Sequence, residues 1–173
     1  ATIMAGNSRE RALNSSAREL ENTVLLLARH FDQQLQDFGA IQQDVAAFVE
    51  AAGIETGEQY RRRMSGADIH LMLKAKIDAF SYVGSINLFD ADGVMINSST
   101  GWPARPINIA DRAFFKTFKS DPKSPLLLVE PVHSRVTGAW TTVLARKLTG
   151  PGGEFLGVIG RGVQPAAFTK FFQ

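Results

Sequence analysis

The chain of 173 residues contains no cysteine, which excludes disulfide bonds and metal sites built on thiolates. It has no apolar run of membrane-spanning length and no signal peptide. Its three histidines lack the spacing of metal ligands. Phosphate-binding loops, nucleophile motifs and metalloprotease signatures are missing as well. The sequence therefore gives no reason to expect an enzyme, a metal or a cofactor.

The net charge is also small: the chain has 19 basic and 17 acidic residues, which gives +2. That balance does not predict binding to nucleic acid. The densest basic cluster, Arg61 to Arg63, falls in residues 55–66, which are predicted as a loop or a loop with one helical turn, and is interpreted as a solvated patch. Ordinary apolar content and this length predict one globular domain over residues 1–173.

Proline is absent before Pro103, and apolar residues recur at spacings of three and four through the first fifty positions. A subset that includes Val24, Phe31 and Phe38 repeats every seven residues. This pattern predicts one long helix over residues 1–52. Its stretch from about residue 9 to 51 alone is on the order of 60 Å long, whereas a domain of this size is about 35–40 Å across. We expect the helix to extend beyond the globular body and to pair with a second copy of itself.

The remaining patterns alternate between one further helical segment and short strands. A second helix is predicted over residues 67–80, and a terminal helix or turn over 165–172. Strands are predicted over 85–90 and 94–99, joined by an Asp-Gly turn, and over 126–135, 139–148 and 154–163. A short helix is predicted over 111–119, within a sheet core of residues 84–163. The start of a calcium loop at Asp90, Asp92 and Gly93 lacks the glutamate that such a loop requires.

The strand over 139–148 carries two different faces, because side chains alternate along a strand. One face is mostly small, with Thr141, Val143 and Ala145, which suits a closely packed helix. The opposite face carries Trp140, Thr142, Leu144, Arg146 and Leu148. Its mixture of an aromatic ring, a hydroxyl and a guanidinium indicates the wall of a pocket. The alternative is that Trp140 is ordinary core and Arg146 pairs with a surface carboxylate.

Arg112 stands at the first turn of the predicted short helix, where the helix dipole disfavours a cation. Free backbone N–H groups and a guanidinium together form an anion site. The alternative is that Arg112 pairs with Asp111 or another surface carboxylate. His133 and Arg135 share a strand face, and a histidine beside arginines favours a carboxylate ligand over a metal.

Several segments, in this order, resemble the PDC/Cache class of bacterial extracytoplasmic sensor domains, which have a PAS-like fold. They are Leu88 to Gly93, Asp111 to Phe115, Pro131 to Arg135, Gly138 to Trp140, Ala145-Arg146 and Gly153 to Val158. The resemblance implies an α+β fold, with the long helix and the second helix on one side of a five-stranded antiparallel sheet. A small-molecule pocket would lie on the other side, behind the loop and short helix around Asp111 to Phe115.

The resemblance also implies a periplasmic domain of an inner-membrane protein, with both termini continuing into membrane helices that this chain lacks. A chain that begins with Ala rather than Met agrees with a piece of a longer protein. The output would be a histidine kinase, a diguanylate cyclase or phosphodiesterase, or a chemoreceptor. Many members bind carboxylates or amino acids through the arginine of an Asp-Arg motif, here Arg112, and through strand residues that match Trp140 and Arg146.

The predicted ligand-binding residues are Arg112, Phe115, His133, Arg135, Trp140, Thr142 and Arg146. The final strands lack a clear aspartate for an amine, so we expect an anionic metabolite. The alternative is a ligand-free module for dimerisation or protein docking. The sensing hypothesis requires Arg112 and Arg146 to share one cavity, and it fails in this form if they point to opposite sides of the fold.

Overall fold

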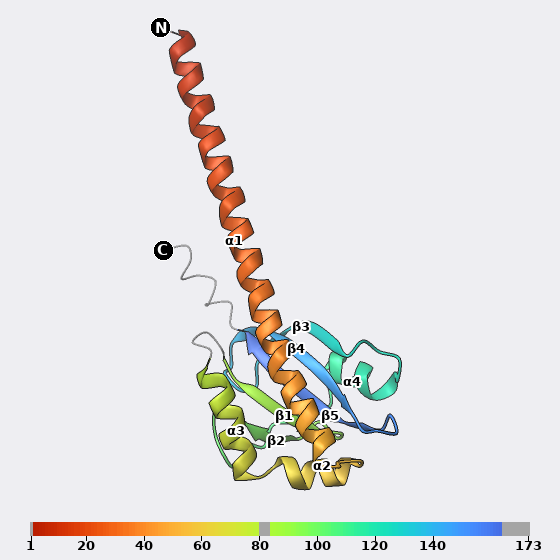
Figure 1. Cartoon of the computed structure of the whole chain (residues 1–173). Helices are drawn as coiled ribbons and strands as arrows, with labels where there is room; N and C mark the ends of the chain where they lie inside the picture. Colours follow the sequence, from red (N-terminus) through yellow and green to blue (C-terminus); the bar gives the residue numbers. More distant parts are fainter. Residues whose placement is uncertain (1, 80–83, 164–173) are drawn as a thin grey trace. The chain divides into compact units, whose positions relative to one another are not determined.

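The computed structural model describes residues 2–79 and 84–163, with residues 2–5 and 163 described by their backbone alone (Figure 1). The helix or turn predicted for residues 165–172 lies outside these ranges. The elements in chain order are α1 (Thr2–Ala51), α2 (Gly57–Met64), α3 (Ala67–Asp78), β1 (Ile86–Asp90), β2 (Met95–Ser98), α4 (Ala113–Ser120), β3 (Leu127–His133), β4 (Trp140–Thr149) and β5 (Phe155–Val163).

The strands form one five-stranded sheet in the order β2-β1-β5-β4-β3, and every neighbouring pair is antiparallel. Strands β3, β4 and β5 follow one another as hairpins, because Gly138 and Gly153 supply the positive φ values that these turns need. β1 then pairs with β5 and brings β2 to the far edge. The predicted α+β fold with an antiparallel sheet is confirmed.

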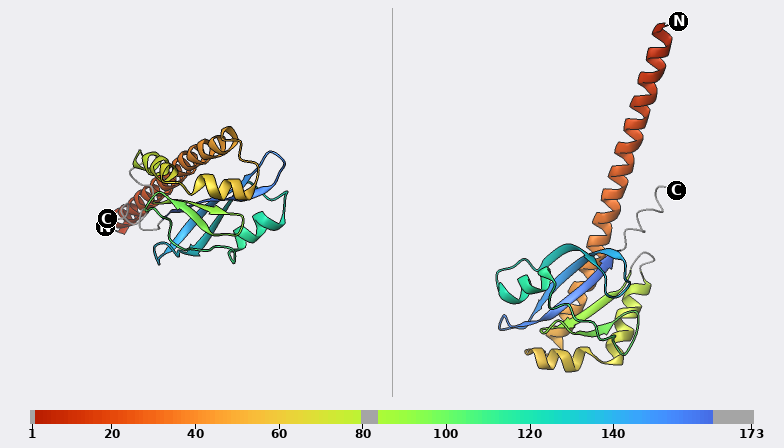
Figure 2. Two further views of the ribbon diagram at one scale, coloured as in Figure 1. Left: turned by 90° about the horizontal axis from the view of Figure 1, so that it is seen from below. Right: turned by 180° about the vertical axis from the view of Figure 1, so that it is seen from behind.

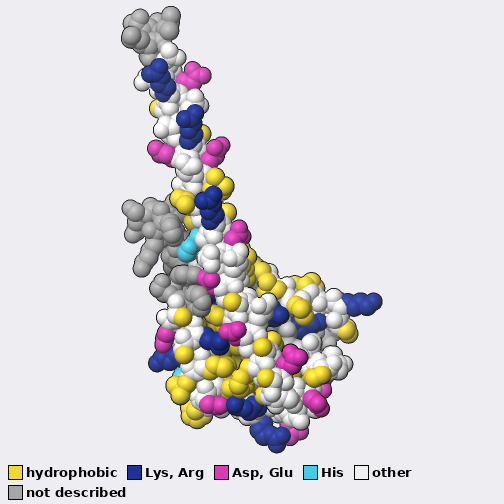
Figure 3. All heavy atoms as spheres, viewed as in Figure 1, with side chains coloured by type: hydrophobic (Ala, Val, Ile, Leu, Met, Phe, Trp, Pro, Cys, Tyr) yellow, Lys and Arg dark blue, Asp and Glu magenta, His cyan; other side chains and the backbone are white. Residues whose placement is uncertain are grey.

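The chain divides into two units, residues 1–40 and residues 41–173. The first unit is α1 alone, and large apolar side chains such as Leu13, Leu20 and Val24 are exposed along it (Figure 3). The second unit contains the rest of α1, the other helices and the sheet. The predicted extension of the long helix beyond the globular body stays a prediction.

In the second unit, helices cover both faces of the sheet (Figure 2). Residues 41–51 of α1, with α2 and α3, cover the face that carries Ile86, Leu88 and Leu144. The opposite face meets α4 and the loop before it. There Phe89, Met95, Ile109, Phe114, Phe115, Phe118, Val132, Ala145 and Val158 form a buried apolar cluster. The predicted arrangement had the long helix and the second helix on one side, which agrees with residues 41–51 of α1 and with α3, and α2 is a third helix on that side.

Helix α2 occupies the stretch predicted as a loop or a loop with one helical turn. Thr56 and Gln59 form a capping box at its N-terminus, and Tyr60 and Met64 are buried from its inner side. The Thr-x-x-Gln spacing is the sequence signal for this helix. Arg61, Arg62 and Arg63 are exposed, as predicted for a solvated patch, and Arg61 in addition forms ion pairs with Asp90 and Asp92.

The turn between β1 and β2 uses its carboxylates internally. Asp90 Oδ1 accepts hydrogen bonds from the backbone N–H groups of Asp92 and Val94, both at 2.9 Å. Its other oxygen lies 2.7 Å from Arg61 Nε. Of the residues that the structure describes, no three or more His, Asp or Glu side chains gather as metal ligands do. The calcium-like spacing is therefore explained by a local turn.

Lys147 anchors the turn between α4 and β3, and we expect its replacement to destabilise the second unit. It is only 5% exposed, and its ammonium donates to Asp121 O, Pro122 O and Ser124 Oγ. Lys147→Met removes these charge-assisted bonds and leaves the three acceptors without this donor, at a cost of about 2–3 kcal/mol. Urea denaturation measures the change. The exposed Lys123→Met is the control and should leave stability unchanged, and equal stability of both variants would contradict the expectation.

Candidate functional site

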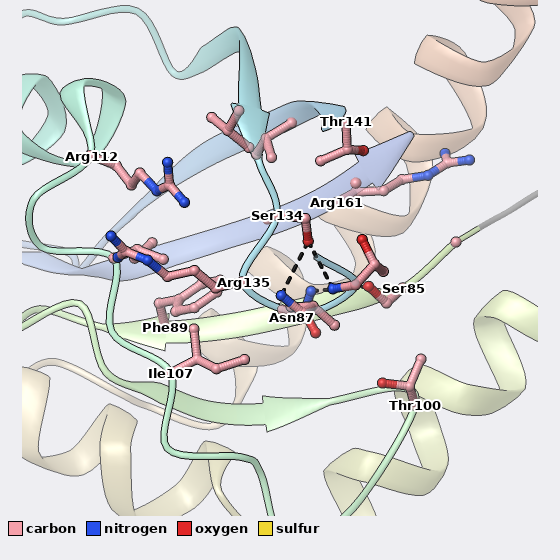
Figure 4. Close-up of a pocket in the computed structure, with 18 of the residues that line it drawn as sticks. Ser85, Asn87, Phe89, Thr100, Ile107, Arg112, Ser134, Arg135, Thr141 and Arg161 are labelled. Atoms are coloured by element: carbon pink, nitrogen blue, oxygen red, sulfur yellow. Dashed lines mark hydrogen bonds between the residues drawn. The ribbon is translucent and has the colours of Figure 1, made fainter. Parts of the chain in front are cut away.

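A cavity of about 240 Å³ lies on the sheet face opposite α1 and α3 (Figure 4). Strands β1, β4 and β5 form its floor. Its roof comes from the loop between β2 and α4, the start of α4 and the turn between β3 and β4. The lining residues are Gly84, Ser85, Asn87, Phe89, Thr100, Arg105, Ile107, Ile109, Arg112, Phe114, Val132, Ser134, Arg135, Val136, Thr137, Thr141, Val143, Gly160, Arg161 and Gly162.

Two glycines in β5 make room for the cavity. Gly160 pairs with Asn87 of β1, and Gly162 pairs with Val143 of β4, so both positions face the cavity. A Cβ at position 160 would lie 3.3 Å from Phe89 Cε2, and one at 162 would lie 3.3 Å from Thr141 Oγ1. The central strand therefore contributes backbone alone to the floor at these positions.

The lining is cationic. Arg105, Arg112 and Arg135 approach from the roof, and Figure 4 shows the last two close to one another. Arg161 contributes backbone only, because its register with Leu144 places its buried side chain on the helix-covered face. Among the described residues that line the cavity, none is Asp or Glu. Cationic side chains beside a partly enclosed apolar space favour an anion.

Arg112 is the N-cap residue of α4 and makes no capping bond with its side chain. Its Nη2 donates to the backbone carbonyl of His133 at 2.7 Å. This bond joins Arg112 to a neutral acceptor, and no ion pair of Arg112 occurs in the described part of the chain. The alternative in which a surface carboxylate neutralises Arg112 is therefore not what the structure shows.

One of the N–H groups in the first turn of α4, that of Phe114, is already bonded within the protein, which limits the predicted anion site there. Glu130 Oε2, from β3, accepts a hydrogen bond from Phe114 N at 3.1 Å. A carboxylate at this end of a helix also satisfies the helix dipole. The Glu130 carboxylate thus occupies the position expected for a ligand anion at this helix end. Of the predicted anion site, the Arg112 guanidinium is the part that still lines the cavity.

Arg135 is held by Asp111 in a two-pronged ion pair. Its Nη1 and Nη2 donate to the two carboxylate oxygens at 2.7 and 2.6 Å, and Nη1 also donates to Asn108 O. Hydrogen bonds from this guanidinium lower the pKa of the Asp111 carboxyl to about 2. Both side chains are largely exposed, so water screens the interaction.

A neutral polar network lies at another part of the wall. Asn87 donates to Ser85 Oγ at 3.1 Å and accepts from Ser98 Oγ at 2.8 Å. The hydroxyls of Ser98 and Thr100 are 2.9 Å apart. Asn87 and Ser98 are buried, and their hydrogen bonds with one another satisfy part of their polar capacity.

Of the residues predicted to bind a ligand, Arg112 and Arg135 line the cavity. His133 contributes its carbonyl, while its ring packs edge-on against Trp140 with centroids 5.9 Å apart. Phe115 is buried in the apolar cluster, where its ring contacts Phe155. The prediction that these side chains share one site is thus corrected for His133 and Phe115.

The interpretation of the mixed face of β4 as the pocket wall is wrong. Thr141 and Val143 line the cavity, so Trp140, Thr142 and Arg146 point to the opposite face. Arg146 lines a different hollow, beside Ala46 and Val49 of α1. Trp140 is exposed at the end of β4. Arg112 and Arg146 therefore do not share a cavity.

Sequence reasoning missed Asn87, Arg105, Thr141 and Gly160. Thr141 belongs to the face of small side chains, which suited helix packing equally well. The glycines at positions 157, 160 and 162 were the available signal, because glycine within a strand often marks the close approach of a ligand or another backbone. Nothing in the local pattern around Arg105 points to a cavity.

Comparison by sequence finds neither a family model nor a characterised protein that matches the chain. Comparison of structures finds similar folds. The extracellular domain of rpHK1S-Z16, a proposed histidine kinase, matches with a TM-score of 0.65 and 23% identity, over 83% of this chain and 55% of that one. The ligand-binding domain of the Campylobacter jejuni chemoreceptor Tlp3, in complex with 4-methylisoleucine, matches with a TM-score of 0.64 and 14% identity, over 88% and 58%.

The sensor domain of the Vibrio cholerae histidine kinase DctB matches with a TM-score of 0.53 and 16% identity, over 86% of this chain and 59% of that one. At these identities the comparisons establish a shared fold. The chain has the fold of PDC/Cache-like extracellular sensor domains, as the resemblance implied. It spans somewhat more than half the length of these three structures. In the described part of the chain, no helix is both long and apolar enough to cross a membrane.

We expect the Asp111 carboxyl to titrate with a pKa of about 2, which NMR of side-chain carboxyl groups measures. Because the folded value lies below the ordinary 3.8, the pair stabilises the fold fully above pH 3.8 and loses its effect as the pH falls toward 2. In Arg135→Ala the pKa should return toward 3.8. A pKa that stays low in that variant would show that another group holds the carboxylate ionised.

Proposed function

We propose that the chain is the extracytoplasmic ligand-sensing domain of a bacterial membrane-bound signalling protein, of the histidine kinase or diguanylate cyclase/phosphodiesterase type. Its ligand is a small anionic metabolite that binds in the cavity. The observation that carries this proposal is a partly enclosed, largely apolar cavity whose lining includes Arg105, Arg112 and Arg135, of which only Arg135 forms an ion pair in the described part of the chain, and, among the described lining residues, no carboxylate. The shared fold with sensor domains supports it.

The sensing hypothesis as proposed here does not depend on a cavity shared by Arg112 and Arg146. Arg146 is on the other face of the sheet, and the hypothesis in its original form fails. Arg105 and Arg135 now accompany Arg112. The cations that support the proposal therefore come from the roof of the cavity rather than from its floor.

An anion is favoured over an amino acid because none of the described lining residues is a carboxylate that could pair with an ammonium group. Tlp3 structures hold L-valine and L-norvaline as well as isoleucine. An ammonium needs a carboxylate or several carbonyl acceptors when it leaves water. Here Asp111 and Glu130 are engaged by Arg135 and by the N-terminus of α4. Residues 1, 80–83 and 164–173 contain no Asp or Glu.

The cavity volume indicates a small ligand. About 240 Å³ is below the roughly 300–1,000 Å³ of sites for drug-sized molecules. Phe89, Ile107 and Val132 give part of the wall an apolar surface, and the hydroxyls and amide near Asn87 offer neutral hydrogen bonds. A short organic acid with an uncharged polar group satisfies both surfaces.

We expect Arg112→Ala to weaken binding of the ligand roughly tenfold or more, as for a lost charge-assisted hydrogen bond. Thermal denaturation against a panel of short organic acids and amino acids identifies ligands that raise the melting temperature of the wild type. The shift should vanish or shrink in Arg112→Ala. Arg146→Ala is the matched control, because it removes the same charge from the other face of the sheet. Loss of the shift in Arg146→Ala alone, or a flat panel for the wild type, would contradict the proposal.

The proposal includes a homodimer formed through α1. In residues 13–24 a seam of Leu13, Ala17, Leu20 and Val24 repeats with the alternating spacing of four and three that coiled coils use, and all four side chains are exposed. Apolar residues on an exposed helix favour association with a like surface. A second copy of the helix presents such a surface.

We expect Leu20→Glu to convert the dimer to a monomer in sedimentation equilibrium, because it places a charge in the seam. Arg18→Ala changes a neighbouring residue outside the seam and should leave the dimer intact. A wild-type chain that is monomeric at all concentrations, or a Leu20→Glu variant that still dimerises, would count against pairing through α1.

A docking module without a ligand is the second candidate, and one observation favours it. Leu127, Val129 and Trp140 expose apolar surface on β3 and β4, on the face away from the cavity. Exposed patches of this kind mark interaction sites. A flat ligand panel together with loss of a partner complex in Trp140→Ala would favour docking over sensing.

A further inference from the structure

Two short segments meet above the cavity. One is the turn between β3 and β4, residues 134–139, and the other is residues 108–112 before α4. Ser134, Arg135, Val136 and Thr137 of the first line the cavity, as do Ile109 and Arg112 of the second. Together they separate part of the cavity from solvent, and we refer to them as the strap.

Each segment is closed on itself by local hydrogen bonds. Ser134 Oγ accepts from Val136 N and Thr137 N, both at 3.1 Å, and Gly138 N donates to Ser134 O at 2.9 Å. In the other segment, Ala110 N donates to Asn108 Oδ1 at 2.7 Å and Arg112 N donates to Ile109 O at 2.9 Å. Each turn keeps its shape without help from the other.

The bonds that join the two segments come from a few side-chain atoms. In the described part of the chain they are the two-pronged pair between Arg135 and Asp111 and the bond from Arg135 to Asn108 O. The bond from Arg112 to His133 O joins the same region at the end of β3. No backbone hydrogen bond joins the described residues of one segment to those of the other.

We propose that the strap is a gate for the cavity and that the Asp111–Arg135 pair is its clasp. Side-chain bonds at the surface break far more easily than a ladder of backbone bonds, so the two turns can separate as preformed pieces. Local opening of this kind admits a ligand while the sheet stays folded. The gating of a ligand rests on the proposed function, whereas the opening itself does not.

The clasp also assigns a different role to each arginine. Arg135 is neutralised by Asp111 and acts as a positioning residue for the strap. Arg112 makes no ion pair in the described part of the chain, although its charge also favours the ionised Asp111, and it remains the cation at this end of the cavity that a ligand can meet. Access and charge recognition are thus divided between two side chains of the same roof.

The absence of cysteine permits a direct test of opening by thiol labelling. Val132→Cys places a thiol of similar size under the strap, at a cavity-lining position that is 5% exposed. Its rate of reaction with a small thiol reagent then reports how often the cavity opens. In the Asp111→Asn background we expect this rate to rise by up to about fivefold, the upper end of the range for loss of an exposed ion pair.

Two controls separate opening of the strap from general destabilisation. Asp68→Asn breaks the Arg63–Asp68 pair, whose side chains are 43% and 61% exposed, against 41% and 61% for Arg135 and Asp111. It should leave labelling of Cys at position 132 unchanged. Val49→Cys places a thiol on the helix-covered face and should react at the same rate with and without Asp111→Asn.

Faster labelling at position 132 alone, seen only with Asp111→Asn, supports the gate. An unchanged rate in that background overturns it, and so does equal acceleration at positions 49 and 132, because that would mean global unfolding. A rise with Asp68→Asn overturns the assignment of the clasp. No ligand is needed, so the result stands whether or not the thermal panel identifies one.

Discussion

The cavity exists because the central strand of the sheet has no side chain where its neighbours do. Gly160 and Gly162 lie between Phe89 on one side and Thr141 and Val143 on the other. A β-carbon at either position would meet a neighbouring side chain at 3.3 Å, so even alanine would crowd the floor. The roof can hold its arginines over an open space only while β5 stays bare there. Volume, charge and access all depend on this constraint.

Local patterns sufficed for most of the fold and failed for the site. The hairpins follow from short apolar runs between glycine-rich turns, which act within a few residues of the chain. Alternation along β4 places Thr141 and Thr142 on opposite faces of the sheet. The pattern does not indicate which of the two faces a helix covers. We chose the face with the guanidinium as the pocket wall. The small face is the one left open, because α4 and its preceding loop bring bulky residues such as Phe114 and Ile109 to fill the space beside it.

The roof shows how the protein limits its own positive charge. Both carboxylate oxygens of Asp111 accept hydrogen bonds from Arg135, and Glu130 accepts one from the first turn of α4. Two positions where a ligand anion could bind are therefore already occupied by the protein's own carboxylates. These contacts depend on residues that are 16 and 24 positions apart in sequence. No local pattern reveals such pairs. Arg112 could be identified from its place at a helix start, but that it remains without a described carboxylate could only be seen in three dimensions.

The cavity and the second-unit part of α1 lie on opposite faces of one sheet layer. In β4, Val143 faces the cavity and the next residue, Leu144, faces the helix side, where Val45 and Val49 of α1 are buried. A ligand can shift α1 only if it binds two arrangements of this layer with different affinity. Contacts with the rigid floor alone are the same in both arrangements and shift nothing. The two segments of the strap, which can separate from one another, are where a ligand can gain contacts in one arrangement that it lacks in the other, so a signal should originate at the strap rather than at the sheet.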